Sequence, residues 1–524
     1  MLPLGLFWLP GMGLGWGGPS AILGPGMVVG MQVARKSVEA DERSFRAAVL
    51  LIFAITILRL VWIASGVAEL YPDEAQYWVW SLHPAWGYYS KPPVVAWLIA
   101  FTTSMVGSNN ELAVRVAAPL LHFGTALMVH AVARRLYDAR VAFWSAIAYA
   151  TLPGVWVSSI IMSTDAPLLF CWVIALYAFV RAREPGGGRW WAAVGLAAGA
   201  GLLSKYAMAY WLISALLFLV VYRDERRHLR GFATATGLAL LVYAPNFVWN
   251  FDHGFVSYRH TEANAGFSGP LFHPNSFLEF FGSQFGVFGP IFFAALIACA
   301  CLGRRMLRER REAMLAMFAL PTLAMMLVVS FLSRAQPNWS APTYVSAVIL
   351  VVWMLLTQGR RVLIVGSIAL HVVAAIVAVE LRPVSHALGY DLPGKYDPLH
   401  RLNGWRILGT SVGRMMIEYP GLRLLADDRE LMAALIYYIP QHPLDGLKWN
   451  AMGGIHDQFD LEAHPEQMIG KDFLLVSYRN NIDDIVSRFA DVGPVQSITV
   501  MLGGGMSRNY QVRFLHDFKG YPAP

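Results

Sequence analysis

The chain has 524 residues, of which 56% are hydrophobic and only 14% are charged. This composition is more apolar than a soluble domain allows, and it places the chain among polytopic membrane proteins. The net charge of +7 does not indicate nucleic-acid binding, because most basic residues lie in short loops between apolar stretches. The three cysteines all lie inside apolar runs and predict no disulfide framework: Cys171, Cys299 and Cys301.

The first thirty residues are rich in Gly and Pro, with no basic segment ahead of an apolar stretch. They are typical neither of a signal peptide nor of a membrane helix. Met27 or Met31, just ahead of Arg35 and Lys36, is an alternative start of the chain. Residues 1–44 are therefore taken as an N-terminal cytoplasmic segment, with a mis-assigned start as the alternative, and no function is assigned to them.

About eleven apolar stretches follow between residues 45 and 382, and each is long enough to cross, or nearly to cross, a bilayer. A full crossing takes ~20 apolar residues, with ~17 as the practical lower limit. Stretch 190–203 is short by this measure, and so is a twelfth stretch, 92–106. The eleven are 46–68, 113–133, 141–160, 166–182, 190–203, 206–222, 231–249, 285–302, 313–332, 341–357 and 362–380.

Lys and Arg predict which side of the membrane each loop faces, because cytoplasmic loops carry an excess of them. The basic connections fall on one side only if 92–106 does not cross the membrane and 190–203 does. This assignment puts the N-terminus in the cytoplasm and the C-terminal tail outside. The basic connections are 134–140, 181–189, 223–230, 304–311 and 360–361. The outer segments are 71–112, 161–165, 204–205, 250–284, 333–340 and everything after 381.

From about residue 383 the composition changes, and charged residues return. Strand-like runs at 422–426 and 473–476 alternate with helix-like segments at 428–438 and 481–490, which is typical of a small α/β domain of ~140 residues. The sequence thus predicts a mainly α fold. A polytopic helical domain over 45–382, with helices in its outer loops, precedes a periplasmic α/β domain over 383–524.

The first outer loop begins with an acidic, aromatic-rich segment that contains the adjacent carboxylates Asp73 and Glu74. Paired acids at a membrane interface are costly unless they are hydrated, paired or functional. One interpretation is an interfacial loop with solvated acids. The other is a general base that activates an acceptor hydroxyl, with or without a bound divalent cation.

A second acid, Asp165, lies in a Ser163-Thr164-Asp165-Ala-Pro167 turn between two spans. Ser, Thr and Asp favour helix N-caps and Pro suits the first turn, so capping alone explains this pattern. Because Asp165 and Asp73 fall on the same predicted side, a shared acidic pocket is the functional alternative.

Four cations are almost the only ones in the outer loops of the membrane part: Lys91, Lys205, Arg259 and Arg334. Snorkelling, in which the charged end of the side chain extends to the membrane interface, would explain any single one of them. Four on the side of the acids suggest a phosphate site, with Arg binding through a fork and Lys as a point charge.

Two histidines lie in the same outer loop as Arg259, at His253 and His260. Their seven-residue separation does not match the i, i+4 pair of a helical zinc site. Contact with a donor substrate and ordinary loop packing both remain open for them. The turn at 336–339, next to Arg334, is similarly polar and faces outward.

Together, four short motifs in this order resemble bacterial GT-C glycosyltransferases, in the protein-mannosyltransferase-like branch. That branch includes the lipid A aminoarabinose transferase and the rhizobial lipopolysaccharide galacturonosyltransferases, and the resemblance covers roughly residues 45–380. The motifs are Asp73-Glu74, Tyr88-Tyr89-Ser90-Lys91-Pro92, Ser163-Thr164-Asp165 and Leu203-Ser204-Lys205-Tyr206.

The resemblance implies a polyprenyl-phosphate-linked sugar donor and transfer on the periplasmic side of the bacterial inner membrane to a lipid, glycan or protein acceptor. Asp73 would match the family's catalytic acid, Asp165 a second acid, and Lys91 the lysine that meets the donor phosphate. The aminoarabinose transferase has Glu before that lysine, where this chain has Ser90. A metal site that depends on that Glu does not carry over, and metal dependence stays open.

Two other functions compete with an inverting glycosyltransferase. A transporter or flippase of a lipid-linked sugar should carry ionisable residues at the membrane midplane, often in broken helices. Here the spans carry few charges, with Arg59 and Arg115 as the exceptions, both nearer the outer end. The other alternative is a non-catalytic envelope assembly protein. That function would not explain the paired acids or the outer cations.

Overall fold

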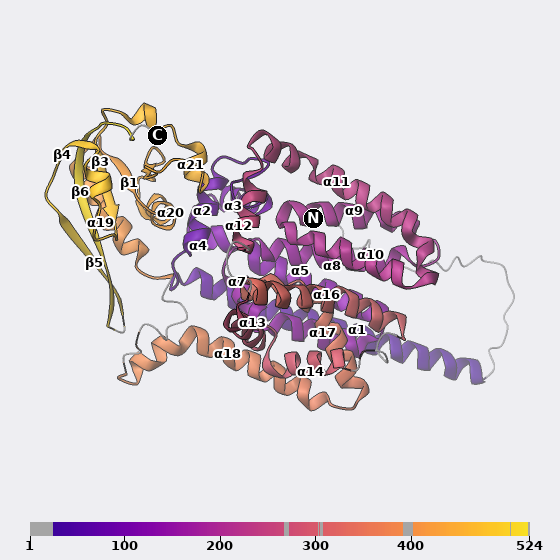
Figure 1. Ribbon diagram of the computed structural model, residues 1–524. Helices are drawn as coiled ribbons and strands as arrows, with labels where there is room; N and C mark the ends of the chain where they lie inside the picture. Colours follow the sequence, from indigo (N-terminus) through magenta and orange to yellow (C-terminus); the bar gives the residue numbers. More distant parts are fainter. Residues whose placement is uncertain are drawn as a thin grey trace. The chain divides into compact units, whose positions relative to one another are not determined.

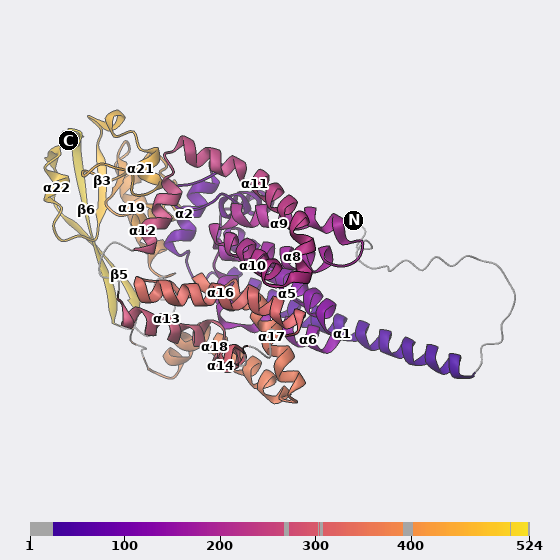
Figure 2. The same ribbon diagram turned by 45° about the vertical axis from the view of Figure 1, so that its right-hand side comes forward.

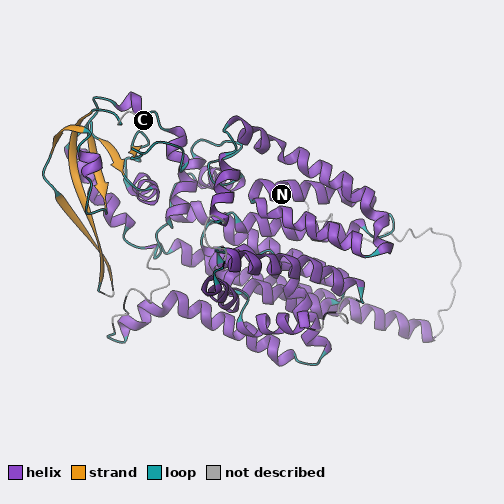
Figure 3. Ribbon diagram, viewed as in Figure 1, coloured by secondary structure: helices purple, strands orange, loops and turns teal. Residues whose placement is uncertain are grey.

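The computed structural model describes residues 25–266, 272–301, 303, 308–390, 393, 402–503 and 505–521. The first 24 residues of the predicted N-terminal segment and part of the basic connection 304–311 lie outside the described residues. The described residues from 48 onward form one compact unit, and those before residue 48 belong to a separate unit. In the larger unit, helices precede a small sheet (Figures 1 and 3).

The membrane part is built from helices joined by short connections. The helices are α1 (Pro25–Ala64), α2 (Pro72–Ser81), α3 (Val94–Val106), α4 (Glu111–Arg115), α5 (Ala117–Leu136), α6 (Ala139–Thr151), α7 (Pro153–Ile160), α8 (Asp165–Ala182), α9 (Trp190–Ser204), α10 (Ala209–Val221), α11 (Leu229–Asp252), α12 (Val256–Ala265), α13 (Pro274–Val287), α14 (Pro290–Cys301), α16 (Arg310–Leu332), α17 (Thr343–Thr357) and α18 (Arg361–Ala387).

Within the described ranges, six helical segments are long and apolar enough to cross a membrane, or up to eight if each of two bent pairs is one span. The protein is therefore a multi-pass membrane protein. Each of the eleven predicted stretches is largely helical, but α9 and α17 have only 15 residues each. The count of eleven spans stays a prediction. The stretch expected not to cross is α3, which has 13 residues.

Two predicted spans are bent. The stretch 141–160 divides into α6 and α7 at an angle of 56°, where Pro153 begins α7. The stretch 285–302 begins inside α13, and α14 turns away from it by 115°. Gly289 makes this turn with a positive φ of 88°, and a side chain there would meet the His371 ring. Glycine adopts this conformation without strain, so the sequence permits the sharp turn.

The C-terminal part is a mixed six-stranded sheet in the order β2-β1-β3-β6-β4, with β5 paired to β6. Strands β1 and β3 are parallel, whereas β6 is antiparallel to β3, β4 and β5. The strands are β1 (Arg423–Ala426), β2 (Leu447–Lys448), β3 (Phe473–Ser477), β4 (Phe489–Val492), β5 (Gln496–Gly503) and β6 (Met506–Phe518). The helices are α19 (Trp405–Glu418), α20 (Arg429–Tyr438), α21 (Gln458–Glu462) and α22 (Asp483–Val486).

The predicted small α/β domain is therefore confirmed, and α20 matches the helix expected at 428–438. The helix expected at 481–490 is wrong in extent, because only four residues form α22 and the chain enters β4 at Phe489. The predicted domain boundary at residue 383 falls near the C-terminal end of α18.

Helix α2, in the first loop predicted to face outward, packs beside α20 of the sheet domain (Figure 1). The Trp78 ring meets the Tyr437 ring edge-on at 5.0 Å and lies 4.9 Å from the His442 ring. Figure 2 shows the sheet at the end of the helices where α2 and α12 lie. Aromatic side chains of the loop that contains α2 are buried in a core shared with the sheet domain: Tyr77, Trp78, Trp80 and Tyr88.

Candidate active site

The two adjacent acids of α2 point in different directions. Pro72 is the first residue of α2, and the Glu74 carboxylate accepts the backbone N–H of Tyr71 at 2.9 Å, which closes the first turn. Neighbouring residues on an α-helix project about 100° apart, because there are about 3.6 residues per turn. Asp73 and Glu74 therefore have separate surroundings.

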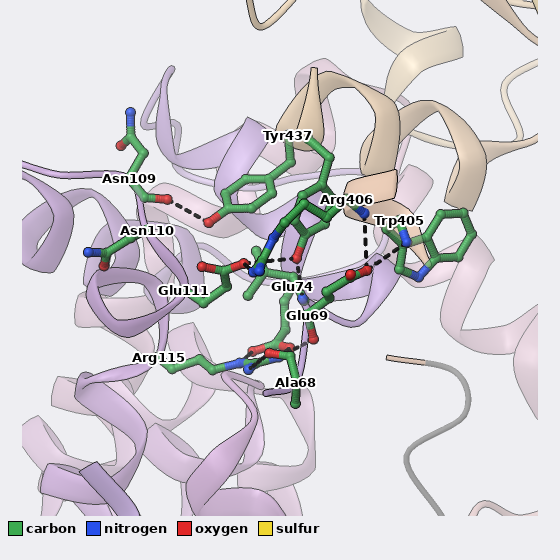
Figure 4. Close-up of polar contacts among 12 residues, drawn as sticks. Ala68, Glu69, Glu74, Asn109, Asn110, Glu111, Arg115, Trp405, Arg406 and Tyr437 are labelled. Carbon is green, nitrogen blue, oxygen red and sulfur yellow. Dashed lines mark hydrogen bonds and ion pairs between the residues drawn. The ribbon is translucent and has the colours of Figure 1, made fainter. Parts of the chain in front are cut away.

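Glu74 is fully buried and bound to Arg115 (Figure 4). Arg115 donates to its two carboxylate oxygens at 2.8 and 2.6 Å, and the backbone N–H of Met162 donates at 2.8 Å. Arg115 also donates to the carbonyls of Ala68 and Glu69. Both oxygens of Glu74 are thus used in holding α2, α4 and the connection before α8 together.

Asp73 faces the sheet domain. Its carboxylate accepts from the Arg429 guanidinium at 2.9 Å, and the Asp73 side chain is 41% exposed. Arg429 is the first residue of α20, and it also donates to the side-chain oxygen of Gln76, about one helical turn beyond Asp73. Asp73 is therefore held by a cation but still open to solvent.

Asp165 is the buried acid of the site. Its carboxylate accepts from the Lys205 ammonium at 2.6 Å and from the Asn338 amide at 2.7 Å. The Ser163 hydroxyl accepts the backbone N–H of Asp165, and Thr164 is the N-cap residue of α8. The Asp165 carboxylate thus binds other segments, and capping alone does not account for it.

Lys91 lies within electrostatic reach of both Asp73 and Asp165, and His260 within reach of Asp73. Burial and then the like charge of Lys205 lower the pKa of Lys91, against the attraction of Asp73 and Asp165. Burial and then Lys91 lower the pKa of His260 to about 4, so this imidazole is neutral at neutral pH. We name this group the outer charged cluster; it consists of Asp73, Lys91, Asp165, Lys205, His260 and Arg429.

Three predicted site residues are not counted in this cluster. Glu74 belongs to the buried pair with Arg115, whereas Arg259 and Arg334 are exposed. Across the described ranges of the chain, no group of three or more His, Cys, Asp or Glu side chains is arranged to hold a metal ion.

The sheet domain is anchored to the loop region between α1 and α5, and this contact brings Arg429 to Asp73. The Glu69 carboxylate accepts the backbone N–H of Trp405 at 2.6 Å, and the Tyr437 hydroxyl donates to the Asn109 carbonyl at 2.6 Å (Figure 4). Arg429 was not among the sequence-predicted site residues. The sequence placed Arg429 at the start of a predicted helix, and that position alone does not indicate an ion pair with Asp73.

Comparison with known proteins places the chain in a family. The family model for dolichyl-phosphate-mannose-protein mannosyltransferase matches residues 90–249, a range that contains Lys91, Asp165 and Lys205. The chain is 31% identical over 395 residues to the lipid A galacturonosyltransferase RgtD of Rhizobium johnstonii, covering 75% of this chain and 82% of that protein.

Two further relatives extend the comparison. An undecaprenyl phosphate-alpha-4-amino-4-deoxy-L-arabinose arabinosyl transferase of Pseudomonas aeruginosa is 26% identical over 396 residues, which cover 68% of this chain and 67% of that protein. The crystal structure of ArnT from Cupriavidus metallidurans bound to undecaprenyl phosphate superposes with a TM-score of 0.59 at 18% identity, covering 89% of this chain and 97% of that one, which shows a common fold. The chain belongs to the protein-mannosyltransferase-like family of GT-C glycosyltransferases.

Proposed function

We propose that this protein transfers a sugar from a polyprenyl-phosphate carrier to an acceptor of the bacterial envelope, on the periplasmic face of the inner membrane. The observation that carries the proposal is the outer charged cluster. It joins two carboxylates and three cationic side chains from segments far apart in the sequence of a GT-C family member.

In this proposal Asp73 is the general base. An acceptor hydroxyl attacks the anomeric carbon of the donor sugar and gives its proton to the Asp73 carboxylate. The bond between that carbon and the phosphate oxygen breaks, and the lipid phosphate leaves with the bonding electrons. Direct displacement inverts the anomeric centre. The 41% exposure of the Asp73 side chain supports this assignment, because a base must be reached by the substrate.

Lys91 and Lys205 would hold the donor phosphate. Both are cations in the cluster, and stabilising the charge of a leaving phosphate lowers the barrier to its departure. Asp165 would orient Lys205 through their 2.6 Å contact. The neutral His260 would serve as a hydrogen-bonding partner of the donor, and the exposed Arg259 and Arg334 would attract the anionic headgroup at the rim. Glu74, which was predicted with Asp73 as catalytic, would instead support α2 through Arg115.

The contacts support the predicted orientation in the membrane. Polar contacts join each of the six predicted outer segments to another outer segment, as in Asp165–Lys205 and Asp73–Arg429. Basic connections on the predicted inner side contact one another as well. These ion pairs are Arg135–Glu184, Arg183–Glu225 and Arg310–Asp224. This segregation favours the parity of eleven crossings. Together with the excess of Lys and Arg in the second group of loops, it favours an N-terminus in the cytoplasm and a sheet domain in the periplasm.

The names of the relatives suggest the substrates. One is a lipid A galacturonosyltransferase, and others are undecaprenyl phosphate-aminoarabinose transferases. We therefore propose an undecaprenyl-phosphate-linked sugar as donor and lipid A or another lipopolysaccharide sugar as acceptor, with other glycans and protein as alternatives.

A transfer assay tests this proposal. Purified protein would be incubated with polyprenyl-phosphate sugars and a panel of envelope acceptors, and the products would be identified by mass spectrometry. We expect a glycosylated acceptor and free polyprenyl phosphate in equal amounts. Movement of labelled lipid-linked sugar across vesicles, without transfer to any acceptor, would support the flippase instead.

A further inference from the structure

A pocket of about 410 Å³ lies where the sheet domain meets the start of α2. This volume falls within the ~300–1,000 Å³ that is typical of small-molecule sites. Its walls come from four parts of the sheet domain and from α2. The lining residues are Pro72, Trp405, Asp428, Glu430, Tyr478, Arg508, Asn509 and Tyr510.

The lining combines aromatic rings with hydrogen-bonding groups. Trp405 and Tyr510 are buried, whereas Tyr478 is 54% exposed and accessible to an occupant. The Arg508 guanidinium lies 5.4 Å from the centre of the Trp405 ring, and Arg508 is the one basic residue of the lining. Rings that offer an apolar face beside polar groups match a molecule that is itself both apolar and hydroxyl-rich.

The polar groups of the pocket are held in position. The Asp428 carboxylate accepts the backbone N–H groups of Glu430 and Leu431 at 2.8 and 3.0 Å, which fixes it at the start of α20. The Asn509 side-chain oxygen accepts the Thr499 hydroxyl at 2.8 Å. A carboxylate accepts hydrogen bonds only, whereas an amide both donates and accepts, so the pair suits sugar hydroxyls.

The pocket lies beside the proposed base. Pro72 directly precedes Asp73, and Asp428 and Glu430 flank Arg429, whose guanidinium binds the Asp73 carboxylate at 2.9 Å. An occupant of the pocket would therefore lie next to the Asp73–Arg429 pair. The donor phosphate ligands proposed above, Lys91 and Lys205, are not part of this lining.

We propose that this pocket binds a saccharide ring of the acceptor and presents a hydroxyl of that saccharide to Asp73. The aromatic rings contact the apolar face of the sugar, the carboxylates and the Asn509 amide bind its hydroxyls, and Arg508 binds an anionic substituent such as a phosphate. This inference rests on the proposed function, since it assigns the acceptor of the same reaction.

Two variants and two matched controls test the pocket in the full-length protein. Tyr478→Ala removes an exposed ring of the lining, and Tyr419→Ala removes an equally exposed ring of the same domain outside the lining. Arg508→Gln removes the cation, and Arg414→Gln removes an exposed cation of α19. The probe is a phosphorylated glucosamine disaccharide without acyl chains, and its binding is measured by saturation-transfer NMR.

We expect both pocket variants to raise the acceptor KM roughly tenfold, because each loses one contact worth about 1.4 kcal/mol. The donor KM and both controls should match the wild type. Arg508→Gln should also remove any preference for the phosphorylated disaccharide over its dephosphorylated form. An unchanged acceptor KM in both variants of an active enzyme would overturn the inference.

The binding assay separates this inference from the proposed function. If the wild type transfers no sugar, the proposed function fails, but disaccharide binding that Tyr478→Ala weakens and Tyr419→Ala does not would still support a saccharide site. No binding by the wild type, or equal binding by all variants, would overturn the pocket as a saccharide site even if transfer occurs.

Discussion

The Asp73 carboxylate and the Arg429 guanidinium lie 2.9 Å apart although 356 positions separate them in the sequence. Asp73 belongs to α2, in the first predicted outer loop, and Arg429 begins the first long helix after strand β1 of the sheet domain. The ion pair therefore joins the membrane part to the C-terminal part at the proposed base. Removal of the sheet domain would leave Asp73 without this partner.

We predict that Arg429→Gln lowers kcat by about 10- to 100-fold, because misplacement of a catalytic group by about 1 Å can cost that much. The donor KM should change little, since the proposed phosphate ligands are elsewhere, and Arg429→Lys should restore part of the rate. Steady-state kinetics would measure kcat and the donor KM of these variants, with Arg414→Gln as the control. A rate equal to that of the wild type would rule out a positioning role for Arg429.

Replacement of Glu74 should affect stability before chemistry. Breaking a buried ion pair by removing one partner costs about 3–5 kcal/mol, because the other charge stays buried without compensation. Glu74→Gln should therefore lower the midpoint of thermal unfolding in detergent, whereas Asp73→Asn, at a partly exposed pair, should lower it much less. A Glu74→Gln protein with normal stability and no transfer would instead give Glu74 a role in catalysis.

The pH dependence of donor binding should reveal the coupling of Lys91 to Lys205. Burial and then Lys205 lower the pKa of Lys91, so its ammonium loses its proton at a lower pH than an ordinary lysine. Donor affinity should fall as the pH rises through this lowered pKa. In Lys205→Gln the repelling charge is gone, the pKa of Lys91 rises, and the fall in affinity moves to higher pH.

This shift can be followed with a fluorescent polyprenyl-phosphate sugar in a pH series that runs from neutral pH up to the ordinary pKa of lysine, about 10.4. Lys205→Gln should also weaken binding at every pH, so the midpoint of the curve, and not its height, is the readout. The Arg414→Gln protein should keep the wild-type midpoint. An unchanged midpoint in Lys205→Gln would show that the two lysines do not interact.

The Asn338 amide should contribute to catalysis through Asp165. It donates to one oxygen of the Asp165 carboxylate at 2.7 Å, while Lys205 holds the other at 2.6 Å. A hydrogen bond to a charged group is worth about 1.5–3 kcal/mol, so Asn338→Ala should lower kcat/KM by roughly 10- to 100-fold. Gln336→Ala, in the same turn, should have wild-type kinetics. Equal activity of both variants would contradict this role.

Transfer should persist after treatment with a chelator. The carboxylates of Asp73 and Asp165 are each bound to a cation of the chain, Arg429 and Lys205. A divalent cation would have to displace these partners to bind there. Activity assayed in excess EDTA measures this directly, and activity that disappears and returns with added Mg²⁺ or Zn²⁺ would show that a metal is needed.

Much of the outer charged cluster could be predicted because its residues are unusual in a membrane protein. Asp73, Lys91, Asp165 and Lys205 interrupt apolar sequence, where a charge is costly without a task or a partner. The asymmetry of Lys and Arg then assigned all four to one side. The sequence could not tell which cation meets which acid, since such pairs depend on how the spans pack.

The rest of the site depends on tertiary contacts that leave no local pattern. Asp73 and Glu74 are equivalent in sequence, and only Arg115 and Arg429 give them different surroundings. The docking of α20 on α2 buries aromatic side chains of this loop, and no local pattern in the sequence indicates that contact. The sharp turn at Gly289 could likewise not be predicted, because it depends on how α14 packs near His371.

The most direct test of the central claim compares Asp73→Asn with the wild type in one experiment that measures donor binding and sugar transfer together. The account predicts that Asp73→Asn binds the polyprenyl-phosphate sugar as the wild type does but transfers it at least about 100 times more slowly, in the range expected for loss of a general base. Full transfer by a correctly folded Asp73→Asn protein would show that another group takes the proton and would contradict the account.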